Sequence, residues 1–391
     1  MTVELLYYDG TWLMDQLLHQ RQEFDQPLLN FICAHETGWF TSVRSGYDRT
    51  VESNHYPVNL CSDPLPREPN KNSLSDIFHE RAKNLWNLSQ PLSFMWSGGI
   101  DSTSALVALI NTNPSWHRDM QIITTAFCLQ NENPQFFKDF LQPHNCVAVV
   151  EGSTFLSKNY WLSRPLVVTG DCADQLFGFG FVPRLPGKLL TDRSIRDVSI
   201  GQVQSMAFDL VQEKYQYLRE NQLTGPCLDQ FHALPEARDI FMTWFLDFIQ
   251  RCPISIRDGF DFQWWVAFST KLQTLRYRAA WLTGDARMAD LGRYRAFFDC
   301  APFQRWAIDH HHDKWPGRLP HTYKQPFKDF IYATTCDPVY QQNKGKESTW
   351  QHSLPTGVKP TSCIKYLDSS NFVMPRSPNW LPESQLLSIL H

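Results

Sequence analysis

The sequence predicts an α/β fold, in which a parallel sheet with flanking helices is followed by a mostly helical C-terminal part. Two short apolar segments, residues 91–96 and 165–169, each run into a turn that contains glycine and aspartate and then into helix-forming residues. Beyond residue 197, large aromatic residues recur at helical spacing, as expected for helices with one apolar face. The first pattern favours parallel strand pairing, and the second favours helix packing.

The chain is expected to divide into two domains, residues 1–88 and 89–391. The first is small and mixes helical and strand-like pieces before a polar, proline-containing stretch. The second contains a core of alternating strands and helices at residues 89–182 and a helical part at residues 197–391. Aromatic residues in the helical part are expected to form core packing, with a wall of a ligand pocket as the alternative.

The hexapeptide SGGIDS, residues Ser97–Ser102, lies between the first predicted strand and a helix that ends near Pro114. Its two glycines allow backbone angles closed to other residues and let a ligand approach the main chain. The unpaired amides at the helix start, together with the helix dipole, attract an anion such as phosphate. Asp101 would repel a bare phosphate but suits a phosphate-bound Mg²⁺, which prefers oxygen ligands. The loop therefore predicts nucleotide and Mg²⁺ binding, with an ordinary capped turn as the alternative.

A second apolar strand leads into a turn in the sequence PLVVTGDCADQLFG, which starts at Pro165 and ends at Gly178. This turn carries two carboxylates, Asp171 and Asp174. Open α/β folds bind ligands at the carboxyl ends of their parallel strands. The two turns are therefore expected to form one binding site.

SGGIDS resembles the pyrophosphate loop of the N-type ATP pyrophosphatases, the PP-loop or adenine nucleotide alpha hydrolase-like family, which includes asparagine synthetase, β-lactam synthetase and lasso-peptide cyclases. Thr169–Gly178 resembles the SGEGADELFGG segment of the asparagine synthetase branch. The resemblance implies a Rossmann-like nucleotide core, ATP and Mg²⁺ as cofactors, and Asp101 and Asp174 as the Mg²⁺ ligands. The residues that it implies around the nucleotide are Met95, Ser97, Gly98, Gly99, Asp101, Ser102, Phe127, Thr169 and Gly170.

Two further strands are expected between the motifs, at residues 121–128 and 146–150. The first matches the family strand whose end contacts adenine, and the resemblance implies this contact for Phe127. The interval between the two motifs is short for the family, and the missing part helps to form the acyl-substrate pocket. The sequence therefore leaves open whether aspartate is the substrate.

The resemblance also implies two catalytic residues. Asp171 replaces the family's first glutamate, which orients or deprotonates the incoming amine, and is one methylene shorter. Residues 341–348, QQNKGKES, resemble the family's basic RxKxxFSDG segment, so that Lys344 is the expected catalytic lysine, with Lys346 in reserve. An ammonium there would stabilise charge on the α-phosphate and the tetrahedral centre. The alternative is a solvated charged loop. Residues 295–303 faintly resemble the family's EARVPFLD segment.

The expected function is that of an ATP-dependent amide-forming ligase that resembles asparagine synthetase. A small-molecule or peptide carboxylate would attack the α-phosphate of ATP with release of pyrophosphate, and an amine or ammonia would then displace AMP. Residues 1–88 are too few for the family's glutaminase domain and are either its remnant or an unrelated addition. A separate amidotransferase or a peptide is therefore a candidate partner. The alternatives are a PP-loop enzyme that modifies a nucleobase or peptide, and a non-catalytic nucleotide-binding partner.

The composition favours a cytoplasmic enzyme. Its 36 Lys and Arg against 40 Asp and Glu give a net charge of −4, which provides no general attraction to nucleic acid. Ten cysteines without a CxxC pair are typical of reduced thiols. No signal peptide or apolar run of membrane-spanning length is expected. The cluster His310–Asp313 is expected at a surface helix end, because adjacent histidines on a helix point about 100° apart.

Overall fold

The computed structural model describes residues 65–66, 68–69, 71–88, 91–150, 166–178, 198–203, 246, 248–272, 275, 294–315 and 322–344. The chain forms two compact units. One unit contains Leu65–Phe177, Leu275–Thr361 and Asn379–His391, and the other contains Met1–Pro64, Gly178–Thr274 and Ser362–Pro378. Most of the expected N-terminal domain, residues 1–88, therefore lies outside the described residues.

A five-stranded parallel sheet forms the centre of the first unit, which confirms the α/β class and the parallel pairing. The strands lie in the order β3-β2-β1-β4-β5. Their bounds are β1 Leu92–Met95, β2 Met120–Thr124, β3 Val147–Val149, β4 Val167–Thr169 and β5 Tyr294–Ala296. The strand expected at residues 121–128 ends at Thr124, because the chain turns there into helix.

All strands are parallel, but the side of the sheet to which new strands are added changes between β1 and β4. From β1 the chain continues outward to β2 and β3, and it then returns to the other side of β1 to form β4. Met95, at the end of β1, stands opposite both Ile123 and Thr169, so that β1 and β4 end at the same level. Such a reversal point opens a crevice at the carboxyl ends of the strands, where open α/β folds bind ligands.

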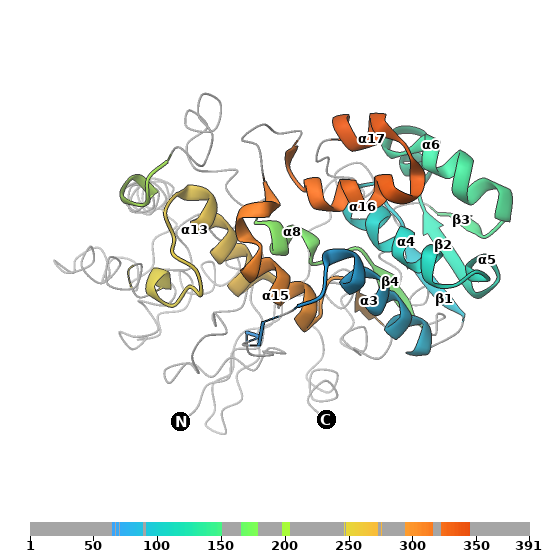
Figure 1. The fold of residues 1–391 in the computed structure, drawn as a ribbon. Coiled ribbons are helices and arrows are strands. Elements are labelled where there is room, and N and C mark those ends of the chain that lie inside the picture. Colours follow the sequence, from blue (N-terminus) through green and yellow to red (C-terminus); the bar gives the residue numbers. More distant parts are fainter. Residues whose placement is uncertain are drawn as a thin grey trace, which may run out of the picture. The chain divides into compact units, whose positions relative to one another are not determined.

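Three helices, α3 Leu74–Leu88, α4 Ile100–Thr112 and α16 Gln325–Thr335, pack in contact beside the sheet (Figure 1). Helix α4 follows the SGGIDS loop and is buried along most of its length, because its sequence consists of small and apolar residues. Burial of a leucine or valine side chain contributes about 1.5–3 kcal/mol. This burial fixes the start of α4, and hence the loop before it, to the sheet.

An aromatic cluster joins α3 to the last strand and to α16. The Phe78 ring of α3 stacks on Phe330 at 4.1 Å between centroids and meets the edge of Phe327 at 5.0 Å. Arg81, one turn later, donates hydrogen bonds to the carbonyls of Ala296 and Phe297, at 3.0 and 2.9 Å. These bonds satisfy backbone carbonyl groups at the end of β5. They bring residues separated by more than two hundred positions into one core.

The described part of residues 197–391 is mostly helical, but it also supplies the strand β5. Trp264, Trp265 and Phe268, which belong to the aromatic residues at helical spacing in this part, are buried, and this confirms their expected role in core packing. His310 follows the end of helix α15 and is exposed with His312, as expected, whereas His311 is buried. The further elements are α5 Trp116–Asp119, η1 Cys128–Glu132, α6 Pro134–Phe136, η2 Phe137–Leu141, η3 Gln142–His144, α8 Ala173–Phe177, α13 Gly259–Val266, η6 Ala267–Lys271, α15 Ala301–Asp309, η9 His311–Lys314 and α17 Pro338–Asn343.

No helix among the described residues combines the length and the apolar character needed to cross a membrane. The expected strand-like pieces before residue 65 and the aromatic residues Phe241, Trp244 and Phe245 lie outside the described part of the chain.

Candidate functional site

The loop after β1 depends on a glycine at position 98. Gly98 has φ +74°, and a Cβ atom there would lie 2.5 Å from the Cβ of Glu132. Gly99 is the N-cap residue of α4 and has an extended conformation. Because glycine has no side chain, no side-chain hydrogen bond caps the first turn of the helix. The N-terminal amides of α4 thus follow two glycines, Gly98 and Gly99, which expose only main chain. Exposed main-chain amides at a helix start are suited to binding an anion.

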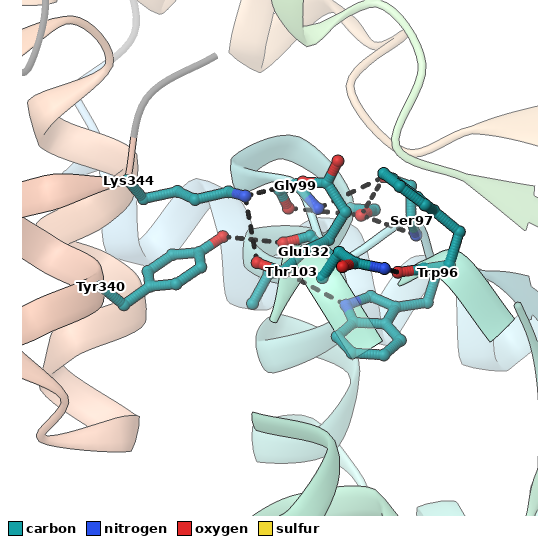
Figure 2. A network of polar contacts seen from close by, with 11 residues as sticks. Trp96, Ser97, Gly99, Thr103, Glu132, Tyr340 and Lys344 are labelled. Atoms are coloured by element: carbon teal, nitrogen blue, oxygen red, sulfur yellow. Dashed lines mark hydrogen bonds and ion pairs between the residues drawn. The ribbon is translucent and has the colours of Figure 1, made fainter. Parts of the chain in front are cut away.

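Two serines fold this loop onto itself. The Ser102 hydroxyl accepts from the Ser97 amide at 3.1 Å and lies 2.9 Å from the Ser97 hydroxyl. Beneath them, the Trp96 indole donates to the Thr103 hydroxyl at 3.1 Å (Figure 2). The loop conformation is therefore fixed by its own side chains, and the hydroxyls stand at the start of α4.

The turn after β4 lies directly against the turn after β1. A Cβ atom on Gly170 would lie 2.8 Å from the main chain of Ser102, so only glycine allows this approach. Thr169 ends β4, and Asp174 lies in the first turn of α8. The structure thus brings together the residues expected around the nucleotide at both strand ends. Phe127 is half-buried at the start of η1, next to Cys128, whose carbonyl also faces Gly98.

Asp101 and Asp174 bind one ammonium group, that of Lys324. The Lys324 Nζ donates to Oδ1 of Asp101 and to Oδ1 of Asp174, the second at 2.6 Å. Burial alone would lower the pKa of Lys324, but the two carboxylates outweigh it and hold the pKa above its ordinary value. Lys324 therefore stays charged at neutral pH, and three residues far apart in the sequence form one ion-pair triad.

The triad also tests whether Mg²⁺ fits here. Two carboxylate oxygens around a single ammonium are close enough to approach one metal ion from both sides. Mg²⁺ is usually held by one or two carboxylates together with water and substrate phosphates. Among the described residues, no group of three His, Cys, Asp or Glu side chains could hold a metal. The donor set thus suits a metal that arrives with a nucleotide.

A third carboxylate, that of Asp171, is fixed by two hydroxyl groups. Its Oδ2 accepts hydrogen bonds from the Tyr294 phenol and, at 2.9 Å, from the Thr169 hydroxyl. Tyr294 is buried at the start of β5, so this contact joins the turn after β4 to the start of β5. Sequence reasoning missed Tyr294, although it stands immediately before the segment 295–303 that resembles EARVPFLD.

Lys344 contacts a different carboxylate, that of Glu132. Its Nζ donates to Oε2 of Glu132 at 2.6 Å and to the Glu132 carbonyl at 3.0 Å. Four residues earlier, the Tyr340 phenol donates to the Gly98 carbonyl at 3.2 Å (Figure 2). Burial raises the pKa of Tyr340, so it remains a neutral donor. The end of α17 therefore fastens the loop from outside.

Lys324 is a second residue of the site that sequence reasoning missed. A signal was available, since Lys324, Phe327 and Asp329 have the spacing of lysine, phenylalanine and aspartate in RxKxxFSDG. When Lys344 is aligned with the lysine of RxKxxFSDG instead, Glu347 stands at the phenylalanine position and Thr349 at the aspartate position. Lys346 lies outside the described residues.

A scan against models of known protein families and a search of curated protein sequences both gave no match.

Proposed function

We propose that the protein is an ATP-dependent amide-forming ligase, which adenylates a carboxylate with release of pyrophosphate and then transfers the acyl group to an amine or ammonia. One observation carries the proposal. Two acidic turns, at the ends of the adjacent strands β1 and β4, converge on a single cation position beside the amide end of α4. This arrangement supports a PP-loop nucleotide site in a Rossmann-like core, as the resemblance to asparagine synthetase implies.

The two turns divide the binding of ATP. Main-chain amides around Gly98 and Gly99 and the hydroxyls of Ser97 and Ser102 would bind the terminal phosphates. Asp101 and Asp174 would hold Mg²⁺, which when bound neutralises charge on the triphosphate and on leaving pyrophosphate. Met95, Thr169 and Gly170, at the neighbouring strand ends, and Phe127 would surround the rest of the nucleotide. The α-phosphate would thus lie at the carboxyl ends of β1 and β4, where open α/β folds bind ligands.

In the first half-reaction, a carboxylate oxygen of the substrate attacks the α-phosphorus, and the bond to pyrophosphate breaks. Negative charge increases at the α-phosphate as this bond changes, and a nearby ammonium stabilises it. Lys324 fits this role better than Lys344, because its ammonium lies on the carboxylates at the loop, whereas that of Lys344 lies on buried Glu132.

In the second half-reaction, the nitrogen of an amine or ammonia attacks the acyl carbon, AMP leaves with the bond electrons, and the nitrogen loses a proton. Asp171 would accept that proton, since it lies at the same strand end and is oriented by the hydroxyls of Thr169 and Tyr294. A separate amidotransferase would supply ammonia if the nitrogen comes from glutamine. Peptide or nucleobase modification by the same chemistry is the alternative.

The test is ATP–pyrophosphate exchange with a panel of carboxylates, beginning with aspartate, followed by addition of ammonia, glutamine or candidate amines. The proposal expects cleavage of ATP to AMP and pyrophosphate with at least one carboxylate. Exclusive formation of ADP, or nucleotide binding without any exchange across the panel, would overturn it.

The two half-reactions can also be separated with Tyr294→Phe. This change removes a hydroxyl from Asp171 but leaves the phosphate loop intact, so it should slow amide formation by about 10²-fold while exchange continues. The conservative control is Thr169→Ser, which retains a hydroxyl beside Asp171. Equal loss of both half-reactions in Tyr294→Phe would remove the assigned role in proton transfer.

A further inference from the structure

The Lys324 ammonium occupies the position that a divalent cation would take between Asp101 and Asp174. Its Nζ bonds one oxygen of each carboxylate, so that each of the two turns directs an acidic side chain at the same atom. A metal ion that bridges these oxygens cannot share this space with the ammonium. Occupancy by lysine and occupancy by metal therefore exclude each other.

The ammonium is enclosed on its other side. It lies 5.7 Å from the centre of the Phe177 ring and 5.5 Å from that of Tyr323, both at cation–π distance. The Lys324 side chain is buried, whereas both aspartates remain partly exposed. A ligand can therefore reach the ion pair from the carboxylate side, and the aromatic side holds the lysine.

Lys324 is attached in a way that permits movement of its tip. Its backbone has φ +58° and precedes the first turn of α16, where Pro326 occupies an early helical position. The main chain is therefore fixed by helix packing against α4, while the four-carbon stem of lysine can rotate. We expect a change of side-chain rotamer to move the ammonium off the carboxylates while α16 stays in place.

We propose that Lys324 is a placeholder cation, which neutralises Asp101 and Asp174 in the nucleotide-free protein and is displaced when a metal–nucleotide complex binds. The displaced ammonium then reaches the phosphates that have entered. Two carboxylates at this distance repel each other unless a cation lies between them, so the lysine keeps the two turns together before the ligand arrives. The inference rests on the proposed function for the identity of the nucleotide. Its consequence is that metal binds poorly unless phosphates come with it.

The test measures Mn²⁺, a paramagnetic substitute for Mg²⁺, by electron paramagnetic resonance of the free ion with the full chain and no nucleotide. Lys324→Met should bind one Mn²⁺ about tenfold or more tightly than the unchanged protein. The gain should vanish in the double variant Lys324→Met/Asp101→Asn. The matched control is the double variant Lys344→Met/Glu132→Gln, which removes both charges of an ion pair beside the same loop and should bind Mn²⁺ as weakly as the unchanged protein.

The inference would be overturned if Lys324→Met bound Mn²⁺ with an affinity within about twofold of that of the unchanged protein. Lys324 would then form a permanent structural ion pair with the two aspartates. Circular dichroism checks the fold of each variant, and Lys324→Gln, which keeps a polar tip without charge, replaces the methionine variant if the latter does not fold. Failure of the proposed function gives a different result. Mn²⁺ would then bind tightly to Lys324→Met although the unchanged protein catalyses no ATP–pyrophosphate exchange.

Discussion

Lys324 and Lys344 each pair with carboxylates beside the same loop, but the two sites differ in which partner is buried. The Lys324 side chain is 3% exposed and its partners Asp101 and Asp174 are 24% and 32% exposed. Lys344 is 11% exposed, and its partner Glu132 is only 1% exposed. The two sites thus differ in the burial of the acid: the buried Glu132 forms a structural ion pair with Lys344, whereas the partly exposed Asp101 and Asp174 remain accessible to a ligand.

The largest expected effect is on stability, at Lys344. Lys344→Met leaves the buried Glu132 carboxylate without its ammonium, which should lower the free energy of unfolding by about 3–5 kcal/mol in urea denaturation. Lys324→Met should cost much less, because Asp101 and Asp174 retain contact with water. The second change Glu132→Gln should restore part of the loss. Equal destabilisation by the two lysine variants would remove the distinction between the sites.

The next effect is on activity, at the acidic side of the Lys324 triad. On the proposed function, Asp101→Asn or Asp174→Asn should reduce ATP–pyrophosphate exchange by about 10²–10³-fold, since each removes a charge that would act on metal and phosphates. Thermal unfolding should change little. Asp329→Asn, which alters an exposed carboxylate on α16, is the control and should keep full exchange. Undiminished exchange in both triad variants would remove the metal assignment.

Gly98 offers a way to disturb the Lys344 side without touching either lysine. Gly98→Ala places a Cβ at positive φ and 2.5 Å from Glu132, and we expect a loss of about 1–3 kcal/mol in unfolding free energy. Gly99→Ala is the matched control, because its nearest contact would be 3.4 Å away at an ordinary φ. A tolerated Gly98→Ala would show that Glu132 moves freely, contrary to its assigned role.

The smallest effect concerns alkaline pH. The Tyr340 pKa is raised by burial above its ordinary value of 10.0, so the unfolded chain loses this proton before the folded protein does. The stability that the neutral phenol contributes is complete below pH 10.0 and declines above it. Tyr340→Phe should cost about 1 kcal/mol at neutral pH and flatten this decline. Tyr332→Phe, at an exposed position of α16, should leave the decline in place.

Sequence reasoning predicted the parts of the fold that are encoded locally. The strands before Trp96 and Gly170, and the turns that follow them, depend on short apolar runs and on glycines that no other residue can replace. The expectation that the two turns form one site followed from parallel pairing, whereas the pairing of Asp101 with Asp174 was implied by the family resemblance. Neither required knowledge of the residues between the two motifs.

The remaining parts depend on contacts between distant segments. Strand β5 is three residues long and is defined by pairing with β4, so the sequence YRA has no alternation to detect. Glu132 is buried by a π-helical turn that has no clear sequence pattern, and it places Lys344. Lys324 reaches Asp101 across 223 positions, a contact that spacing along the chain cannot specify.

The separation of Asp174 and Lys324 by 150 positions has a consequence for synthesis on the ribosome. Chains fold from the N-terminus as they emerge, so both acidic turns are present long before the lysine that neutralises them. The growing chain carries two mutually repelling carboxylates at one sheet edge, and closing so long a loop is slow. We expect truncated chains that end before α16 to keep these turns apart, so that emergence of α16 is the late step that completes the crevice.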